Sequence, residues 1–256
     1  MKIISLHSPN YSIKKRSKKS IKFIVLHYTG MQSERACIKR LIDKKSKVST
    51  HYLINRIGSI TRIVDDQNTA WHAGKSKWKN FTNLNDQSIG IELVNQGHQF
   101  GYENFSKKQI SKLILLCKFL IKKYKIKYSN ILGHSDIAPL RKKDPGEKFP
   151  WHLLSKKKIG YWHDISKKNI KNQNLNKRNL RKFFFNNLYK IGYRYFDKKK
   201  TSKNDLNVIK AFQRRFRQNK VNGLIDQESL QISYYLAGSL KYYLDFCHIS
   251  IIELHR

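Results

Sequence analysis

The sequence predicts an α/β protein in which helices flank a mixed central sheet, followed by a small C-terminal three-helix domain. Between residues 20 and 155, short apolar runs rich in β-branched residues alternate with amphipathic helical patterns. That alternation is typical of α/β folds. After residue 177 the strand signals stop and three helical patterns follow. We therefore predict a first domain over residues 1–155, a basic linker or arm over 156–176, and a helical domain over 177–256.

The first predicted elements are a buried strand and a capped helix. The run KFIVLHY at residues 22–28 is apolar and β-branched, as a buried strand requires. Ser33 can cap a helix that extends to about Asp43. The inward face of this helix is expected to hold Ile38, Leu41 and Ile42.

A hairpin and a second buried strand come next. The segment HYLINRIGSITRIV at 51–64 reads as two alternating strands that meet at Gly58 and Ser59. Residues 65–87 are mostly polar, and we expect them to form a loop. The run SIGIELV at 88–94 predicts another buried strand.

A long amphipathic helix and a short strand complete the first domain. The helix is expected from Ser106 to about Lys123. Its inward residues would be Ile110, Leu113, Ile114, Cys117, Leu120 and Ile121. A strand at 130–132 leads into the loop GHSDIAPLRKKDPGEKFPW, and the domain is expected to end near Trp151.

The predicted helices of the second domain lie near residues 177–191, 204–217 and 227–246. The middle pattern places four apolar residues at helical spacing: Val208, Ala211, Phe212 and Phe216. A segment of this length and aromatic content can form a small helical bundle.

Composition excludes several classes of protein. The 256 residues include 53 basic and 17 acidic side chains, and the net charge is +36. A hydrophobic content of 39% argues against wholesale disorder. The charge could serve nucleic-acid binding, but Lys, Asn and Ile are abundant throughout, as in proteins encoded by AT-rich genomes, and we expect no specific nucleic-acid partner.

The sequence also bears on location. It contains no apolar run near the roughly 18–20 residues that cross a bilayer, so we expect no transmembrane segment. The three cysteines are widely spaced and odd in number, which argues against a disulfide framework. The first residues lack the apolar core of a secretory signal and a lipobox cysteine. These features predict a cytoplasmic protein, with a periplasmic location as the alternative.

Three side chains at strand ends and in loops could bind a metal. His27 interrupts an apolar strand, His134 directly follows a short strand, and Asp144 comes ten residues later. Two imidazoles and a carboxylate form a catalytic zinc ligand set that leaves a fourth position for water. Spacing alone also allows each histidine to be a hydrogen-bonded structural residue.

Four ordered motifs over residues 20–152 give a specific resemblance. They are VLHYT, WHAG, NLNDQSIGIELVN and ILGHSDIAPLRKKDPGEKFPW. Together they resemble the zinc-dependent N-acetylmuramoyl-L-alanine amidases of type 2, in the AmpD/AmiD branch. The resemblance implies an α/β fold, one Zn²⁺ per chain, and hydrolysis of the amide between N-acetylmuramoyl, or its 1,6-anhydro form, and L-alanine. The implied partner is peptidoglycan or a muropeptide, and the alternative is a peptidoglycan-binding module without catalysis.

The resemblance also implies roles for single residues. His27, His134 and Asp144 match the zinc ligands, Glu92 matches the catalytic acid/base, and Lys142 matches the lysine that faces the metal-bound water. From the residues alone, Glu92 could instead be a buried structural carboxylate and Lys142 a solvated charge. Asp136 or backbone carbonyls could orient the ligand imidazoles.

Further residues are candidates for substrate contact. His51 and His72 are plausible residues of a cleft, although each could equally be structural. Trp71 is expected to belong to the core or to the wall of a groove rather than to act as a catalyst. Arg141 could pair with a peptide carboxylate through a bidentate fork.

The segment AFQRRFRQNKVNGLIDQESL has a second resemblance, to the small helical peptidoglycan-binding domain often fused to such amidases. This resemblance implies that Phe212 and Phe216 are core residues. It also implies that Gly223 sets a turn and that Asp226 caps the next helix.

Overall fold

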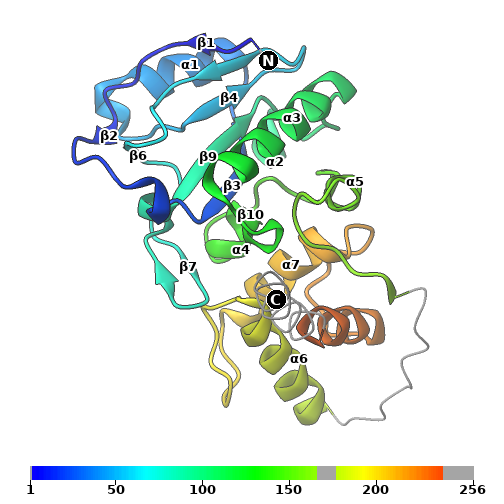
Figure 1. Cartoon of the computed structure of the whole chain (residues 1–256). Coiled ribbons are helices and arrows are strands. Elements are labelled where there is room, and N and C mark those ends of the chain that lie inside the picture. Colours follow the sequence, from blue (N-terminus) through cyan, green and yellow to red (C-terminus); the bar gives the residue numbers. More distant parts are fainter. Residues whose placement is uncertain (1, 166–176, 239–256) are drawn as a thin grey trace, which may run out of the picture.

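The computed structural model describes residues 2–165 and 177–238, and its centre is a six-stranded mixed sheet (Figure 1). The strand order is β1-β5-β4-β9-β3-β10. The strands are β1 (Ile4–Ser5), β3 (Phe23–Tyr28), β4 (Tyr52–Ile54), β5 (Ile60–Arg62), β9 (Ser88–Leu93) and β10 (Ile131–Gly133). Strands β4, β9, β3 and β10 are parallel, whereas β4 and β5 form an antiparallel hairpin. The predicted mixed sheet is confirmed.

Residues 65–87 are not all loop, as the sequence led us to expect. They contain β6 (Thr69–Ala70), which pairs with β2 (Tyr11–Ser12), and a small hairpin of β7 (Lys77–Trp78) and β8 (Phe81–Thr82). Strands of two residues are too short to produce a periodic signal in the sequence. The short 3₁₀ turns are η1 (Lys18–Ser20), η2 (Lys44–Ser46), η3 (Leu84–Gln87) and η4 (Tyr128–Asn130).

Two of the helices, α1 and α3, begin after the serine caps that the sequence predicts. The helices are α1 (Glu34–Ile42), α2 (Gly97–Phe100), α3 (Lys107–Tyr124), α4 (His134–Ile137), α5 (Trp151–Ser155), α6 (Lys177–Ile191) and α7 (Asp205–Phe216). The hydroxyls of Ser33 and Ser106 accept hydrogen bonds from backbone N–H groups in the first turns of α1 and α3. The prediction for Ile42 is wrong: it is exposed at the end of α1, and Cys37 is buried beside Leu41 instead.

Alternation along the strands gives the sheet two different faces. Ile24 and Leu26 of β3 pack in one cluster with Leu113 and Leu120 of α3. The side chains between them point to the opposite face, so His27 lies on the same face of β3 as Val25. That second face is the one on which the candidate site lies.

The C-terminal helices pack against this second face. Phe23, Val25 and Leu132 of the sheet belong to one buried cluster with Phe184 of α6 and Phe212 of α7. Figure 1 shows α6 and α7 gathered beneath α4 and β10. The two predicted domains therefore share a hydrophobic core.

The third predicted helix and the predicted linker are described only in part. Residues 227–238 are helical, and the remainder of the third predicted helix lies outside the described residues. Gly223 has φ +80°, and the Asp226 carboxylate accepts a hydrogen bond from the backbone N–H of Ser229 at the start of that helix. In the segment predicted as a linker, Ile159 and Tyr161 are buried, and residues 166–176 are not described.

Among the described residues, no helix has the length and apolar character needed to cross a bilayer.

Candidate active site

Two neighbouring parallel strands and one loop bring together the three predicted metal ligands. His27 is the penultimate residue of β3, and His134 follows directly after the adjacent strand β10. The carboxyl ends of parallel strands lie at the same edge of a sheet, which is where open α/β folds bind ligands. Asp144 reaches this edge from the loop after α4, and its backbone carbonyl accepts a hydrogen bond from the N–H of Ser135.

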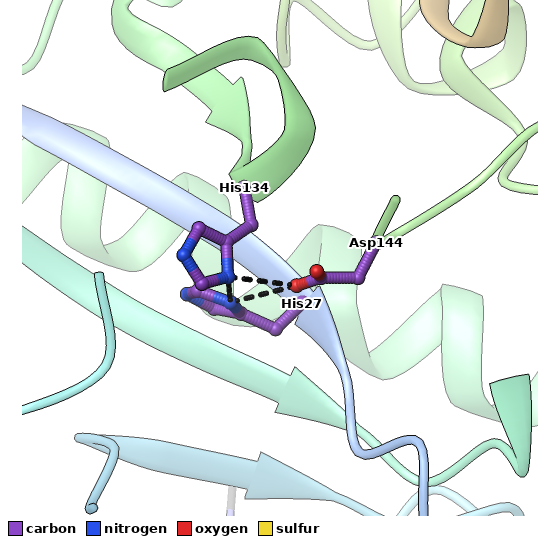
Figure 2. A group of neighbouring side chains, drawn as sticks. All are labelled: His27, His134 and Asp144. Atoms are coloured by element: carbon purple, nitrogen blue, oxygen red, sulfur yellow. Dashed lines mark hydrogen bonds and ion pairs between the residues drawn. The ribbon is translucent and has the colours of Figure 1, made fainter. Parts of the chain in front are cut away.

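The three side chains point at one another (Figure 2). Nδ1 of His27 is 2.9 Å from Nδ1 of His134, and each nitrogen is 3.0 Å from Oδ2 of Asp144. The residues are 1%, 2% and 6% exposed. Two zinc bonds of about 2.0–2.1 Å at a tetrahedral angle put their donor atoms roughly 3.3 Å apart, so this donor set fits a zinc ion. Three acceptors held this close in the interior need a cation or protons among them.

Burial controls the charge of this group. Burial and the neighbouring His134 lower the pKa of His27 to about 4, so its imidazole is neutral at pH 7. Burial alone would raise the pKa of Asp144, but His134 and His27 lower it far below its ordinary value. The site therefore combines a neutral imidazole with an ionised carboxylate, the protonation states that metal ligands require.

Glu92 lies beside His27 because of the strand register. The two residues are paired across parallel strands β9 and β3, so their side chains share one face of the sheet. Burial and the nearby charge of Asp144 raise the pKa of Glu92 well above 4.5, while Lys142 opposes that rise. Its Oε2 is buried and has no hydrogen-bond partner among the described residues. A carboxyl with a raised pKa is suited to exchanging a proton near neutral pH.

A cleft of about 870 Å³ opens over these residues. Its lining includes the three ligands, Glu92 and Lys142. One wall of the cleft comes from α1 and another from α2. The sheet face and the loop before Asp144 connect these two walls. Arg40, Arg141, Lys142 and Lys143 all line the cleft, so an anionic substrate would meet a cationic wall.

The other predicted substrate contacts are placed differently. His72 lines the cleft, and its Nδ1 is 3.0 Å from Nε2 of His27. His51 is fully buried, accepts a hydrogen bond from the Gly90 N–H, and lies outside the cleft lining. Trp71 also lies outside the lining, and its indole N–H donates to the Ser12 hydroxyl. The structure therefore does not bring His51 or Trp71 to this cleft.

Arg141 and Asp136 have partners that the sequence did not indicate. The Arg141 guanidinium lines the cleft but donates to the backbone carbonyls of Ala73 and Lys75. These hydrogen bonds hold the loop at residues 73–75. The expectation that Asp136 orients an imidazole is wrong. Its carboxylate accepts hydrogen bonds from Gly133 N–H, the Tyr193 hydroxyl and Arg215.

Sequence reasoning missed several residues of the cleft wall. Tyr28 follows His27 at the strand end, and its hydroxyl is 2.9 Å from Nδ1 of His98 on α2. Nε2 of His98 is 3.1 Å from the Glu147 carboxylate. The position of Tyr28 beside His27 was a usable signal, whereas the pairing of His98 with Glu147 spans 49 residues and leaves none.

The fold and the site together define an α/β protein with a buried His/His/Asp group that could hold a metal ion and a carboxyl beside it. Residues 17–147 match the family model of N-acetylmuramoyl-L-alanine amidase, and the chain belongs to this family.

Individual relatives agree with the family match. The chain is 38% identical to N-acetylmuramoyl-L-alanine amidase AmiD of Escherichia coli K12 over 233 residues, which are 83% of this chain and 81% of the relative. It is 34% identical to 1,6-anhydro-N-acetylmuramyl-L-alanine amidase AmpD of Haemophilus influenzae, over 57% of this chain and 86% of the relative.

Solved structures show that the likeness extends past the matched family segment. E. coli AmiD, in complex with the substrate anhydro-N-acetylmuramic acid-L-Ala-D-γ-Glu-L-Lys, superposes with a TM-score of 0.76 and 36% identity, over 86% of this chain and 90% of AmiD. Pseudomonas aeruginosa AmpDH3, in complex with an anhydromuramic pentapeptide, superposes with a TM-score of 0.76 and 29% identity. This superposition covers 91% of this chain and 97% of the AmpDH3 chain. Both superpositions cover more of the chain than residues 17–147.

Proposed function

We propose that this amidase binds one Zn²⁺ through His27, His134 and Asp144. With this ion it would hydrolyse the amide between an N-acetylmuramoyl or 1,6-anhydro-N-acetylmuramoyl group and L-alanine. The observation that carries the proposal is the convergence of three buried donor atoms within 3.0 Å of one another, on the same sheet face as Glu92. The names of the amidase relatives supply the bond that is cut.

A bound zinc ion would supply a water of lowered pKa, near 7, and polarise the scissile carbonyl. Glu92 then takes the proton of the attacking water and delivers it to the departing amine of L-alanine. Its raised pKa suits both transfers, because the same carboxyl must accept and release a proton near neutral pH.

Lys142 is proposed to stabilise the negative charge that develops on the carbonyl oxygen. It lines the same cleft and acts electrostatically on Glu92 and on His27. A cation placed in a partly buried cleft stabilises developing charge more strongly than it would in water. Its ammonium group also favours the ionised form of Glu92, which is the form that acts as a base.

The helical segment after residue 177 is proposed to support the catalytic part of the chain by packing against it. This view rests on the shared hydrophobic cluster and on the contacts of Arg215 and Tyr193 with Asp136. A direct contact between these helices and peptidoglycan stays a prediction of the sequence, as does a cytoplasmic location.

A muropeptide assay with metal-depleted and zinc-restored protein tests the proposal. Depletion should abolish release of the L-alanine-terminated peptide, and one equivalent of zinc should restore it. His27→Ala and Asp144→Ala should bind no zinc at the concentration that saturates the native chain. Asn55→Ala, which changes the β4–β5 turn outside the cleft, is the matched control. Zinc-loaded protein that cuts another bond, or ligand variants that keep zinc, would contradict it.

A further inference from the structure

Two consecutive loop residues contact the outer nitrogens of both candidate ligand imidazoles. Nε2 of His27 is 3.0 Å from Nδ1 of His72, and Nε2 of His134 is 3.0 Å from the carbonyl oxygen of Ala73. The inner nitrogens, both Nδ1, face Asp144 and each other. One short segment is therefore placed to determine which nitrogen of each imidazole carries its proton.

The protonation of His134 follows from its partner. A backbone carbonyl can only accept a hydrogen bond, so the 3.0 Å contact with Ala73 places an N–H on Nε2 of His134. Nη2 of Arg141 lies farther from this nitrogen, at 3.4 Å, and donates to the Ala73 carbonyl instead. A neutral imidazole has one N–H, which leaves the lone pair on Nδ1.

The protonation of His27 follows from a longer chain of partners. The Ser88 hydroxyl donates to the Leu84 carbonyl at 2.5 Å, so its oxygen must accept from Nε2 of His72 at 3.2 Å. Nδ1 of His72 is then an acceptor, and Nε2–H of His27 donates to it. His27 is thereby left with its lone pair on Nδ1, as in His134.

Several contacts hold the segment in place. Oδ1 of Asn85 accepts from both backbone N–H groups, at 3.1 Å from His72 and 2.7 Å from Ala73. The His72 ring packs on Gly90 so closely that a Cβ there would lie 2.5 Å from its Cγ. Arg141 donates to the Ala73 carbonyl from the cleft side.

We propose that the segment His72–Ala73, held by Asn85, is a positioning element that keeps both ligand imidazoles in the Nε2–H form, with both Nδ1 lone pairs directed at the metal. This inference rests on the zinc site of the proposed function. His72 acts through His27 rather than on substrate, which gives the histidine of WHAG a role different from the substrate contact that the sequence suggested.

The test measures zinc affinity rather than turnover. His72→Leu removes the acceptor for His27 and should weaken zinc binding about 10–100-fold in a chelator competition, the usual effect of losing such a partner. His72→Asn keeps a carbonyl acceptor near the position of Nδ1 and should recover most of that loss. Long-range ¹H–¹⁵N spectra of the zinc-loaded native protein should show both ligand imidazoles with the proton on Nε2.

A second variant changes Asn85, whose side chain bonds to the segment His72–Ala73 and not to His27 or His134. Asn85→Ala removes the acceptor that holds the segment and should weaken zinc binding by about tenfold. Asn55→Ala also deletes an asparagine that accepts a backbone N–H in a turn, and it should leave zinc affinity unchanged. If His72→Leu does not fold, Asn85→Ala decides the question.

The outcomes separate this inference from the proposed function. Native-like zinc affinity in both His72→Leu and Asn85→Ala, while His27→Ala loses zinc, would overturn the positioning role and leave the ligand set intact. Native-like affinity in His27→Ala itself would overturn the ligand set. Protons on Nδ1 in the zinc-loaded protein would also overturn the inference.

Discussion

At the scale of single residues, Glu92 shows how burial raises the pKa of a carboxyl that is proposed to act as acid and base. Glu92→Gln keeps the shape but removes the group that exchanges a proton. We expect turnover of muropeptide to fall by about 10²–10⁴-fold, the usual contribution of a general acid/base. Zinc stoichiometry should stay at one, because Glu92 is not among the three proposed ligands. Unchanged turnover would remove Glu92 from the mechanism.

The raised pKa of Glu92 also has a consequence for stability. Below about pH 4.5 the carboxyl is neutral in both the unfolded and the folded metal-free protein. Above that pH the unfolded chain loses the proton while burial retains it in the folded state, so the native protein loses free energy of unfolding as the pH rises. Metal-free Glu92→Gln should therefore gain stability over the native chain between pH 4.5 and 8 in urea titrations. If the difference in free energy of unfolding between Glu92→Gln and the native chain stays constant across this pH range, the raised pKa of Glu92 is contradicted.

Lys142 is expected to act on charge rather than on structure. Lys142→Met keeps most of the apolar stem and removes the ammonium group. We expect kcat to fall by about 10²–10³-fold, in line with the loss of one oxyanion-stabilising group. Zinc affinity and thermal stability should change little, since no ion pair of Lys142 is found in the part of the chain that the structure describes. Lys143→Met, on the same cleft wall, is the control, and equal losses in both variants would indicate a general charge effect.

At the scale of elements, a buried ion pair connects α7 to α4, the short helix that begins with His134. The Arg215 guanidinium contacts the Asp136 carboxylate, donates to the Ile131 carbonyl, and lies 4.1 Å from the ring centroid of Trp151. Asp136 is fully buried. The second helical segment thereby contacts the turn that carries a candidate ligand.

Breaking that pair from one side should be costly. Arg215→Met leaves Asp136 buried without its cation, and we expect a loss of about 3–5 kcal/mol in the free energy of unfolding. Chemical denaturation measures it, with Arg214→Met as the neighbouring control, since Arg214 only approaches Glu147 at 3.9 Å. A double variant with Asp136→Asn should recover part of the loss. A cost below about 1 kcal/mol, the range of an exposed pair, would show that the pair contributes little.

At the scale of the whole molecule, the two predicted domains are one packed structure. The second face of the sheet is covered by α6 and α7 over β3 and β10, and Tyr193 after α6 contacts both Trp78 and Asp136. The likeness to AmiD and AmpDH3 also extends over 86% and 91% of the chain. The catalytic part therefore depends on the helices for part of its core.

A chain ending at residue 165 should consequently fail to form a stable catalytic domain. The truncation exposes Phe23, Val25, Leu132 and Ile137, which are buried in the complete chain. Exposed apolar patches of this kind cause aggregation. We expect insoluble protein or loss of a cooperative thermal transition, measured by light scattering and circular dichroism. A soluble monomer that melts like the full chain would show that the domains fold independently.

Much of the fold could be predicted because its signals are local. The period of β3 and β9, the caps at Ser33 and Ser106, and the spacing of Phe212 and Phe216 depend on neighbours a few residues away. Ile42 was misplaced because a periodic pattern does not show where the tertiary neighbours of a helix end. The two-residue strands were missed because two residues are too few to show an alternating pattern.

The sequence alone determined the α/β class, the order of the main elements and the family motifs, because these depend on side-chain chemistry and short-range spacing. The tertiary structure decided which atoms meet. It brought Nδ1 of His27 to within 2.9 Å of Nδ1 of His134, 107 residues away, and placed His72 behind His27. It also paired Asp136 with Arg215 across 79 residues. Such contacts result from the packing of distant segments around one core, which no local pattern in a single sequence records.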